Sequence, residues 1–186
     1  MSSEYIDRYL DETKEIVDRL DRAELLKAIE ILVRTKDSGG RLFILGVGGS
    51  ATNASHAVGD FRKISGIESY TPVDNLSELT ARTNDEGFES IFVEWLRTSR
   101  LGPLDTVMVF SVGGGTEAVS KNLVLAMQYA KDTGTSIVAI VSRDGGAAGR
   151  LADACVLVPV VSDERITPHA EGWQAVLWHL MANAIA

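Results

Sequence analysis

One pattern occurs twice in this chain: a short apolar run, a glycine-rich turn and a stretch with helical character. Leu42–Leu45 leads into Gly46-Val-Gly-Gly-Ser50, and Asp105–Phe110 leads into Ser111-Val-Gly-Gly-Gly-Thr116. Glycines let the backbone come close to a ligand, and the free N–H groups at a helix start favour an anion. Two such turns in one parallel sheet both lie at the C-terminal ends of strands, where open α/β sheets bind ligands. The repeated pattern therefore predicts a phosphate site.

The first turn matches neither of two common nucleotide-binding motifs. It is not a P-loop, because no Gly-Lys-Ser/Thr follows it. It also lacks the G-x-G-x-x-G spacing of a dinucleotide site, because Ala51 stands where the third glycine would be, and this disfavours NAD. A glycine turn after a strand also occurs in α/β proteins that bind nothing there. The phosphate hypothesis therefore rests on the two turns together.

The other apolar runs alternate with helical segments along the chain. Glu68–Val73 is a weak strand broken at Pro72, and Thr135–Val141 and Ala154–Val161 are clearer strands. Helices are predicted from Asp74, over residues 88–101, over residues 117–131 and from Thr167 onward, with a loop over Thr83–Gly87 and a turn at Asp144–Gly146. Alternation at these lengths predicts an α/β fold with a doubly wound, parallel, five-stranded sheet.

Residues 1–37 are predicted to form a helical leader ahead of this core. Ile6, Leu10 and further apolar residues recur between charges at helical spacing, and Asp21 is a candidate N-cap for a second segment. Such a leader either covers the sheet or packs against another subunit. Because no linker or low-complexity segment interrupts residues 41–186, we expect one parallel α/β core and a single domain of 186 residues.

Composition narrows the class of protein. The net charge of −8 argues against general binding to nucleic acid or to membrane surfaces, which needs basic patches. No apolar run approaches the length of a membrane span. The single cysteine, Cys155, lies in an apolar run and is expected to be a core thiol rather than a nucleophile. One cysteine allows no intrachain disulfide, which fits a cytoplasmic protein.

Two helical stretches carry candidates for chemistry. His56 and Asp60 are four residues apart, so they share one helix face about 6 Å apart. Glu171, Gln174 and His179 lie on one broad face of the last predicted helix. Glu171 and His179 are separated by about 12 Å of helical rise, so they share a metal or a substrate only if both lean inward. The alternatives are sites completed by a neighbouring subunit, or a surface carboxylate and an interfacial histidine without chemistry.

The order and spacing of these motifs resemble the SIS (sugar isomerase) family, and within it the sedoheptulose-7-phosphate (phosphoheptose) isomerases. The resemblance covers nearly the whole chain and is carried by Gly46–Ser50, Ser55-His56 with Asp60, Thr83–Phe88, Ser111–Thr116, Arg143-Asp-Gly-Gly146 and Glu171…His179. It implies a flavodoxin-like sheet and a homotetramer with active sites between subunits. It also implies conversion of sedoheptulose 7-phosphate to D-glycero-D-manno-heptose 7-phosphate, for heptose in surface glycans.

The resemblance also implies roles for individual residues. Some members of the family bind zinc, and the matching positions here are His56, Asp60, Glu171 and His179. The expected substrate-binding positions are Gly48, Gly49, Ser50, Asp74, Ser111, Gly113, Gly114, Thr116 and Gln174. Aldose–ketose interconversion needs a base at carbon and an acid for the enediol oxygens. We assign Asp60 as the base and His179 as its acid/base partner, on opposite sides of the substrate.

Several positions depart from the family pattern. Val47 replaces the usual asparagine, and Asp60 is one methylene shorter than the usual glutamate. Val112-Gly113 stands where the isomerases often have Thr-Ser, which leaves fewer hydroxyl groups for a phosphate. Glu171 stands at a glutamine position, and its added charge favours a metal over a bare anion.

Two other functions remain open at this point. One is a non-catalytic SIS protein, since a relative of this fold binds the replication initiator DnaA as a tetramer and others sense phosphosugars for transcription factors. The presence of His56, Asp60, Glu171 and His179 together argues against that function. The other is an isomerase that acts on a different phosphorylated ketose.

Overall fold

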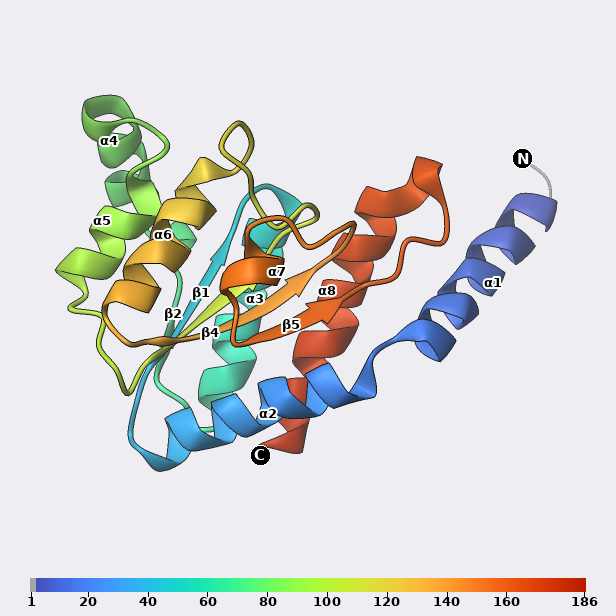
Figure 1. Ribbon diagram of the computed structural model, residues 1–186, viewed down its shortest axis with the longest axis horizontal. Helices are drawn as coiled ribbons and strands as arrows, with labels where there is room; N and C mark the ends of the chain where they lie inside the picture. The colour runs from blue at the N-terminus through green and yellow to red at the C-terminus, as the bar shows by residue number, and fades with distance from the viewer. Residues whose placement is uncertain (1–2) are drawn as a thin grey trace.

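The computed structural model describes residues 3–186 and has a five-stranded parallel sheet at its centre (Figure 1). The strand order is β2-β1-β3-β4-β5, which confirms the predicted doubly wound, flavodoxin-like sheet. The strands are β1 Leu42–Gly46, β2 Ser69–Tyr70, β3 Thr106–Phe110, β4 Ser136–Val141 and β5 Ala154–Leu157. Gly46 is paired with Phe110, so the two glycine-rich turns leave the sheet side by side at its carboxyl edge.

Helices cover both faces of this sheet. Alternate residues of β1 point to opposite cores: Leu42 and Ile44 to one, Phe43 and Leu45 to the other. The first core is closed by α2 Arg22–Asp37, α3 Gly49–Lys63 and α8 Ile166–Ala184, and the second by α5 Ile91–Thr98, α6 Lys121–Asp132 and the short α7 Ala148–Leu151. Within residues 3–186, no helix combines the length and apolar character needed to cross a membrane.

The leader divides into α1, Ser3–Arg19, and α2, as its candidate cap suggested. The Asp21 carboxylate accepts hydrogen bonds from the N–H groups of Ala23 (2.9 Å) and Glu24 (3.2 Å), which starts α2. α2 lies across the sheet, whereas the N-terminal part of α1 projects beyond it (Figure 1), and the C-terminal half of α1 is tied to the core by the buried Ile16 and Glu12. Most apolar side chains of α1 are exposed, namely Tyr5, Ile6, Leu10 and Val17.

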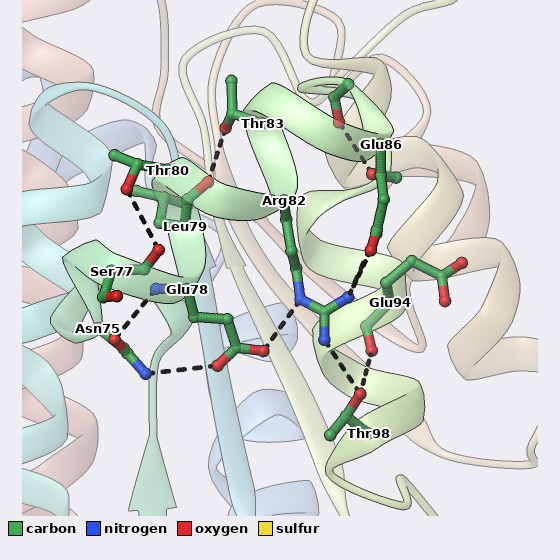
Figure 2. A network of polar contacts seen from close by, with 12 residues as sticks. Asn75, Ser77, Glu78, Leu79, Thr80, Arg82, Thr83, Glu86, Glu94 and Thr98 are labelled. Atoms are coloured by element: carbon green, nitrogen blue, oxygen red, sulfur yellow. Dashed lines mark hydrogen bonds and ion pairs between the residues drawn. The ribbon is translucent and has the colours of Figure 1, made fainter.

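The loop expected over Thr83–Gly87 is wrong for all but its last residue, because α4 runs from Leu76 to Glu86. Arg82 explains the longer helix: its guanidinium bonds Glu78 (2.9 Å) and Glu86 (3.2 Å), one turn away on each side (Figure 2). It also reaches Thr98 on α5 at 3.1 Å, which ties the two helices together. The polar letters that suggested a loop are thus the exposed face of a helix, and α5 begins at Ile91 rather than at residue 88.

The helix expected from residue 117 begins later, at Lys121. The Thr116 hydroxyl accepts hydrogen bonds from the N–H groups of Ala118 (3.2 Å) and Val119 (3.0 Å), and the Thr116 N–H donates to the Val119 carbonyl (2.8 Å). This compact turn, followed by Ser120 in a left-handed conformation (φ 55°), keeps residues 117–120 out of the helix.

Proline shortens two predicted strands. β2 contains only Ser69–Tyr70, because Pro72 begins a 3₁₀ turn, η1 Pro72–Asp74. β5 ends at Leu157, two residues before Pro159, rather than at Val161. A second 3₁₀ turn, η2 Asp163–Arg165, leads into α8.

Candidate functional site

The first glycine-rich turn is so short that α3 begins directly at the edge of the sheet. A Cβ on Gly46 would stand 2.4 Å from the Ser50 carbonyl oxygen, so the chain can turn this tightly only without a side chain there. Gly48 has a φ of 64°, and α3 begins at the next residue. Ser50 in the first helical turn is therefore held against the end of β1 and is almost completely buried.

The second turn forms a packed loop over the neighbouring strand end. A Cβ on Gly114 would stand 1.9 Å from the Gly145 carbonyl oxygen, so this loop and the one after β4 are in backbone contact. The Ser111 hydroxyl accepts the Gly114 N–H at 3.1 Å, and Thr116 accepts the Val119 N–H at 3.0 Å. Both hydroxyl oxygens are thereby oriented by the loop, and their protons can be donated to a bound anion.

A cavity of about 520 Å³ opens between these two turns, the β4 loop and the start of α8. Its size is that of a typical small-molecule site. The walls are Val47, Ser50, Ser111, Val112, Gly113, Gly115, Thr116, Val119, Ser120, Arg143, Asp144, Thr167 and Glu171. The structure thus brings together five predicted site residues in one wall: Ser50, Ser111, Gly113, Thr116 and Glu171. Gly48, Gly49 and Gly114 shape the turns but are not among the wall residues.

A second group of candidates lies further along α3. Ligand atoms of His56, Asp60 and His179 lie within 4.8 Å of one another. His179 Nδ1 is 2.7 Å from the Ala175 carbonyl, so it donates its proton there and turns Nε2 toward the Asp60 Oδ2 at 3.5 Å. The lone pair of Nε2 and the Asp60 carboxylate thus face the same point, an arrangement that could hold a metal cation.

Trp178 holds the two histidines in place. Its ring stacks on His179 with 3.5 Å between centroids, and His56 packs edge-on to it at 4.8 Å. Because Trp178 is fully buried, both imidazoles rest on a fixed surface.

Glu171 lies apart from this cluster. Its carboxylate packs where a Cβ on Gly49 would stand, 2.4 Å from that point, and it lines the large cavity. Among residues 3–186, the group with metal-ligating geometry contains His56, Asp60 and His179 without Glu171.

Two predicted substrate contacts also lie off the cavity wall. Gln174 is fully buried, and its side-chain oxygen accepts from Asn53 at 3.0 Å, which points to a structural role between α3 and α8. Asp74 accepts the Ser55 hydroxyl at 2.5 Å near the exposed side of α3. Within one protomer, Asp60 Oδ2 and His179 Nε2 are 3.5 Å apart, so a substrate cannot lie between them. The expected placement on opposite sides of the substrate does not hold within a protomer.

Two residues of the site were missed at the level of sequence. Asn53 donates to both the Glu171 carbonyl (2.9 Å) and Gln174, and so fixes α8 against α3. Its position one turn before His56 on the predicted helix was the available signal. Arg143 lines the cavity, although the sequence offered it only as part of a family motif and not as a site residue. An arginine beside a glycine turn at the carboxyl edge of a sheet could have indicated an anion contact.

Cys155 takes no part in either group. Burial, with Glu24 as a smaller cause, raises the pKa of its thiol to about 11. The thiol therefore stays protonated at neutral pH, which fits a core thiol rather than a nucleophile.

Fold and cavity together define a flavodoxin-like α/β protein with a hydroxyl-lined site at the carboxyl edge of its sheet. Residues 4–142 match the sequence profile of the SIS domain. The phosphoheptose isomerase of Helicobacter pylori (strain P12) is 30% identical over 168 residues, which are 87% of this chain and 83% of that protein. This chain belongs to the SIS domain family.

Other similar proteins differ in length or in degree of similarity. The lincomycin biosynthesis protein LmbN of Streptomyces lincolnensis is 34% identical over 169 residues, or 84% of this chain, which spans about 60% of LmbN. The structure of phosphoheptose isomerase GmhA from Neisseria gonorrhoeae superposes with a TM-score of 0.83 at 24% identity, covering 98% of this chain and 95% of that one. At that identity, the structural likeness establishes the shared fold.

Proposed function

We propose that this protein is an aldose–ketose isomerase that converts sedoheptulose 7-phosphate to D-glycero-D-manno-heptose 7-phosphate. The observation that carries the proposal is the alignment of two groups along α3. Ser50 lies in the cavity wall, and His56 lies about 9 Å further along the helix axis, followed by Asp60. This separation matches an extended seven-carbon chain with its phosphate among the hydroxyl groups and its C1–C2 end at the His/Asp cluster. The relatives named phosphoheptose isomerase support the same assignment.

The chemistry that this geometry supports is proton transfer through an enediol. Ketose-to-aldose conversion removes a proton from C1 and returns one to C2, while the O1 proton moves to O2. In this proposal Asp60 carries the proton between the carbons, and His179, 3.5 Å away, moves the proton between the oxygens. Hydroxyl groups of Ser111 and Thr116 hold the phosphate, so that each sugar carbon meets the same catalytic group on every turnover.

Zinc fits the His/Asp cluster. Two imidazoles and a carboxylate whose ligand atoms lie within 4.8 Å form a donor set that zinc prefers. The ion would supply Lewis-acid polarisation of the sugar oxygens in place of the proton transfer assigned to His179, because the one free lone pair of that imidazole cannot do both. His56, Asp60 and His179 would hold it, and the bond from His179 Nδ1 to Ala175 would orient that ligand. Glu171 would remain in the cavity to accept hydrogen bonds from sugar hydroxyl groups.

We further propose that the single SIS domain works as a cytoplasmic homotetramer with its active sites between subunits. His56 is exposed and the His179 side chain is 45% exposed, so this cluster is open on one side in a single protomer. Val176 and Leu180, on the same helix as His179, are exposed apolar neighbours that a second copy could cover. Sedimentation of a monomer at micromolar concentration would contradict the assembly.

The test is incubation of the purified protein with sedoheptulose 7-phosphate, with and without zinc, followed by NMR of the sugar products. Asp60→Asn and His179→Ala are assayed in parallel. Formation of the manno-heptose phosphate by the wild type, with both variants inactive, is the expected result.

Two other outcomes would redirect the assignment. Turnover of a different C5 to C7 ketose phosphate, but not of sedoheptulose 7-phosphate, would uphold the aldose–ketose isomerase and replace the proposed substrate. Absence of turnover, with the sugar phosphate still raising the melting temperature, would indicate a non-catalytic sensor or adaptor.

A further inference from the structure

The cavity carries little positive charge for a site that is to hold a phosphate. Among the described residues that line it, Asp144 and Glu171 are acidic and Arg143 is the only arginine or lysine. The chain as a whole has a net charge of −8, so long-range attraction does not help. Hydroxyl donors alone do not offset the repulsion between two carboxylates and a phosphate dianion.

The guanidinium of Arg143 is free to bind a ligand. Within residues 3–186 no hydrogen bond or ion pair occupies it, and the residue is exposed. Its Cδ lies 3.8 Å from where a Cβ on Gly113 would stand, so the side chain follows the loop that carries Ser111 and Thr116. The nearest carboxylate in sequence, Asp144, already accepts the Gly146 N–H at 3.1 Å.

Backbone strain marks the same place. In the described part of the chain, three residues other than glycine have a positive φ: Arg100 (54°), Ser120 (55°) and Arg143 (56°). Ser120 and Arg143 both line the cavity, whereas Arg100 lies before β3, at the opposite edge of the sheet. Left-handed backbone at a non-glycine residue is unfavourable and is concentrated at functional sites.

We propose that Arg143 is a specificity-determining residue that binds the phosphate group of the substrate through its guanidinium. This inference rests on the proposed phosphosugar substrate. A guanidinium can pair with two phosphate oxygens at once and brings the positive charge that the hydroxyl groups of the loop lack. The left-handed backbone at Arg143 aims the side chain over the loop, where a glycine would fit the conformation but provide no charge.

Arg143→Gly and Arg100→Gly form a matched pair, because both remove an arginine from the same strained backbone conformation. Each should raise the melting temperature by about 2 °C through relief of strain. Only Arg143→Gly should weaken binding of inorganic phosphate in calorimetric titration and raise KM for sedoheptulose 7-phosphate, by about 10- to 100-fold, with little change in kcat. Arg143→Lys should recover part of the affinity, because it restores the charge without the bidentate geometry.

The outcomes separate this inference from the proposed function. Unchanged phosphate affinity and KM in Arg143→Gly would overturn the inference while turnover by the wild type upheld the isomerase. Loss of phosphate binding in Arg143→Gly, from a wild type that does not convert the sugar, would uphold the phosphate contact and remove the isomerase. Equal loss of affinity in Arg100→Gly would assign the effect to general electrostatics and overturn the inference.

Discussion

The two strand–turn–helix units look alike in sequence and differ in structure. In the unit formed by β1 and α3, the helix starts directly after the turn, and a Cβ on Gly48 would meet nothing within 4 Å. In the unit formed by β3 and α6, residues 117–120 separate the turn from the helix, and Gly114 is pressed against the Gly145 carbonyl. The first turn has open space only at Gly48 and joins its helix directly, whereas the second is a loop packed on its neighbour.

This difference indicates that the two units contribute different groups of residues to the site. α3 packs along α8, so the first unit brings His56 and Asp60 to His179. α6 packs instead against α5, which leaves the second loop to contribute Ser111 and Thr116 to the cavity. Under the proposed function, the first unit would carry the proton-transfer groups and the second would mainly hold the phosphate, so substitutions in the two units should separate kcat from KM.

Asp60→Asn should have the largest effect. The amide keeps the shape of the carboxylate but cannot take a proton, so kcat should fall by about 10²- to 10⁴-fold with little change in KM. Initial rates with sedoheptulose 7-phosphate measure both constants. Asp60→Glu serves as the control, because it keeps the base and restores the length usual in the family. A rise in KM with kcat unchanged would place Asp60 in substrate binding. The contrast between the two units would then disappear.

Gly114→Ala should cost about 4 kcal/mol of stability, since it combines left-handed strain with a backbone clash. Gly48→Ala, at a similar φ of 64° but with open space around it, should cost only about 1–2 kcal/mol. Urea denaturation of both variants measures the difference. Equal losses of unfolding free energy would show that the second loop accommodates a side chain as easily as the first turn.

Most of the fold could be predicted because the strands are apolar and buried on both faces. β1, β3 and β4 are buried along nearly their whole length, and such runs stand out in sequence. Boundaries were less predictable where polar side chains bond to other side chains or to the backbone. Arg82 extends a helix through residues that look like a loop, and Thr116 delays one through residues that look helical. Secondary-structure propensities do not predict either contact, because each contact depends on where the side chains point in the folded chain.

Residue spacing predicted the candidate site in two separate halves, and the resemblance to the family joined them. Periodicity placed His56 and Asp60 on one face, the resemblance added His179 and Glu171, and the packing of α8 on α3 shows that His179 lies with them while Glu171 faces the cavity. Gln174 has the composition of a ligand contact, and its burial under Asn53 could not be inferred from spacing.

Glu12→Gln tests how firmly the first unit depends on the leader. The Glu12 carboxylate bonds Arg165 at 2.7 and 2.9 Å and His169 at 2.8 Å, which anchors the start of α8 to α1. These partners, chiefly Arg165, lower the pKa of Glu12 from 4.5 to about 2. Its contribution to stability is therefore complete above pH 4.5 and is lost as the pH falls toward 2.

The Glu12→Gln variant should lose about 2–3 kcal/mol at pH 7 and show a flatter decline below pH 4.5 than the wild type. Thermal unfolding from pH 2 to 7 measures this. Glu15→Gln, which breaks an exposed pair with Arg19 on the same helix, should change little. If the stability of wild type and of Glu12→Gln fell equally as the pH was lowered, other contacts would hold the start of α8.

Thr116→Val should have the smallest effect and gives the sharpest test of the second unit. The isosteric change removes the hydroxyl that accepts the Val119 N–H at 3.0 Å and that faces the cavity. Because Thr116 is exposed, water can replace the lost turn contact, and stability should fall by about 1 kcal/mol or less. KM for sedoheptulose 7-phosphate should rise about 5-fold with kcat nearly unchanged, since one phosphate contact is lost while the proton-transfer groups stay in place. Thr116→Ser, which keeps the hydroxyl, should behave like the wild type. A drop in kcat comparable to that of Asp60→Asn would mean that the loop also positions the reacting carbons, and the two units would then share one function.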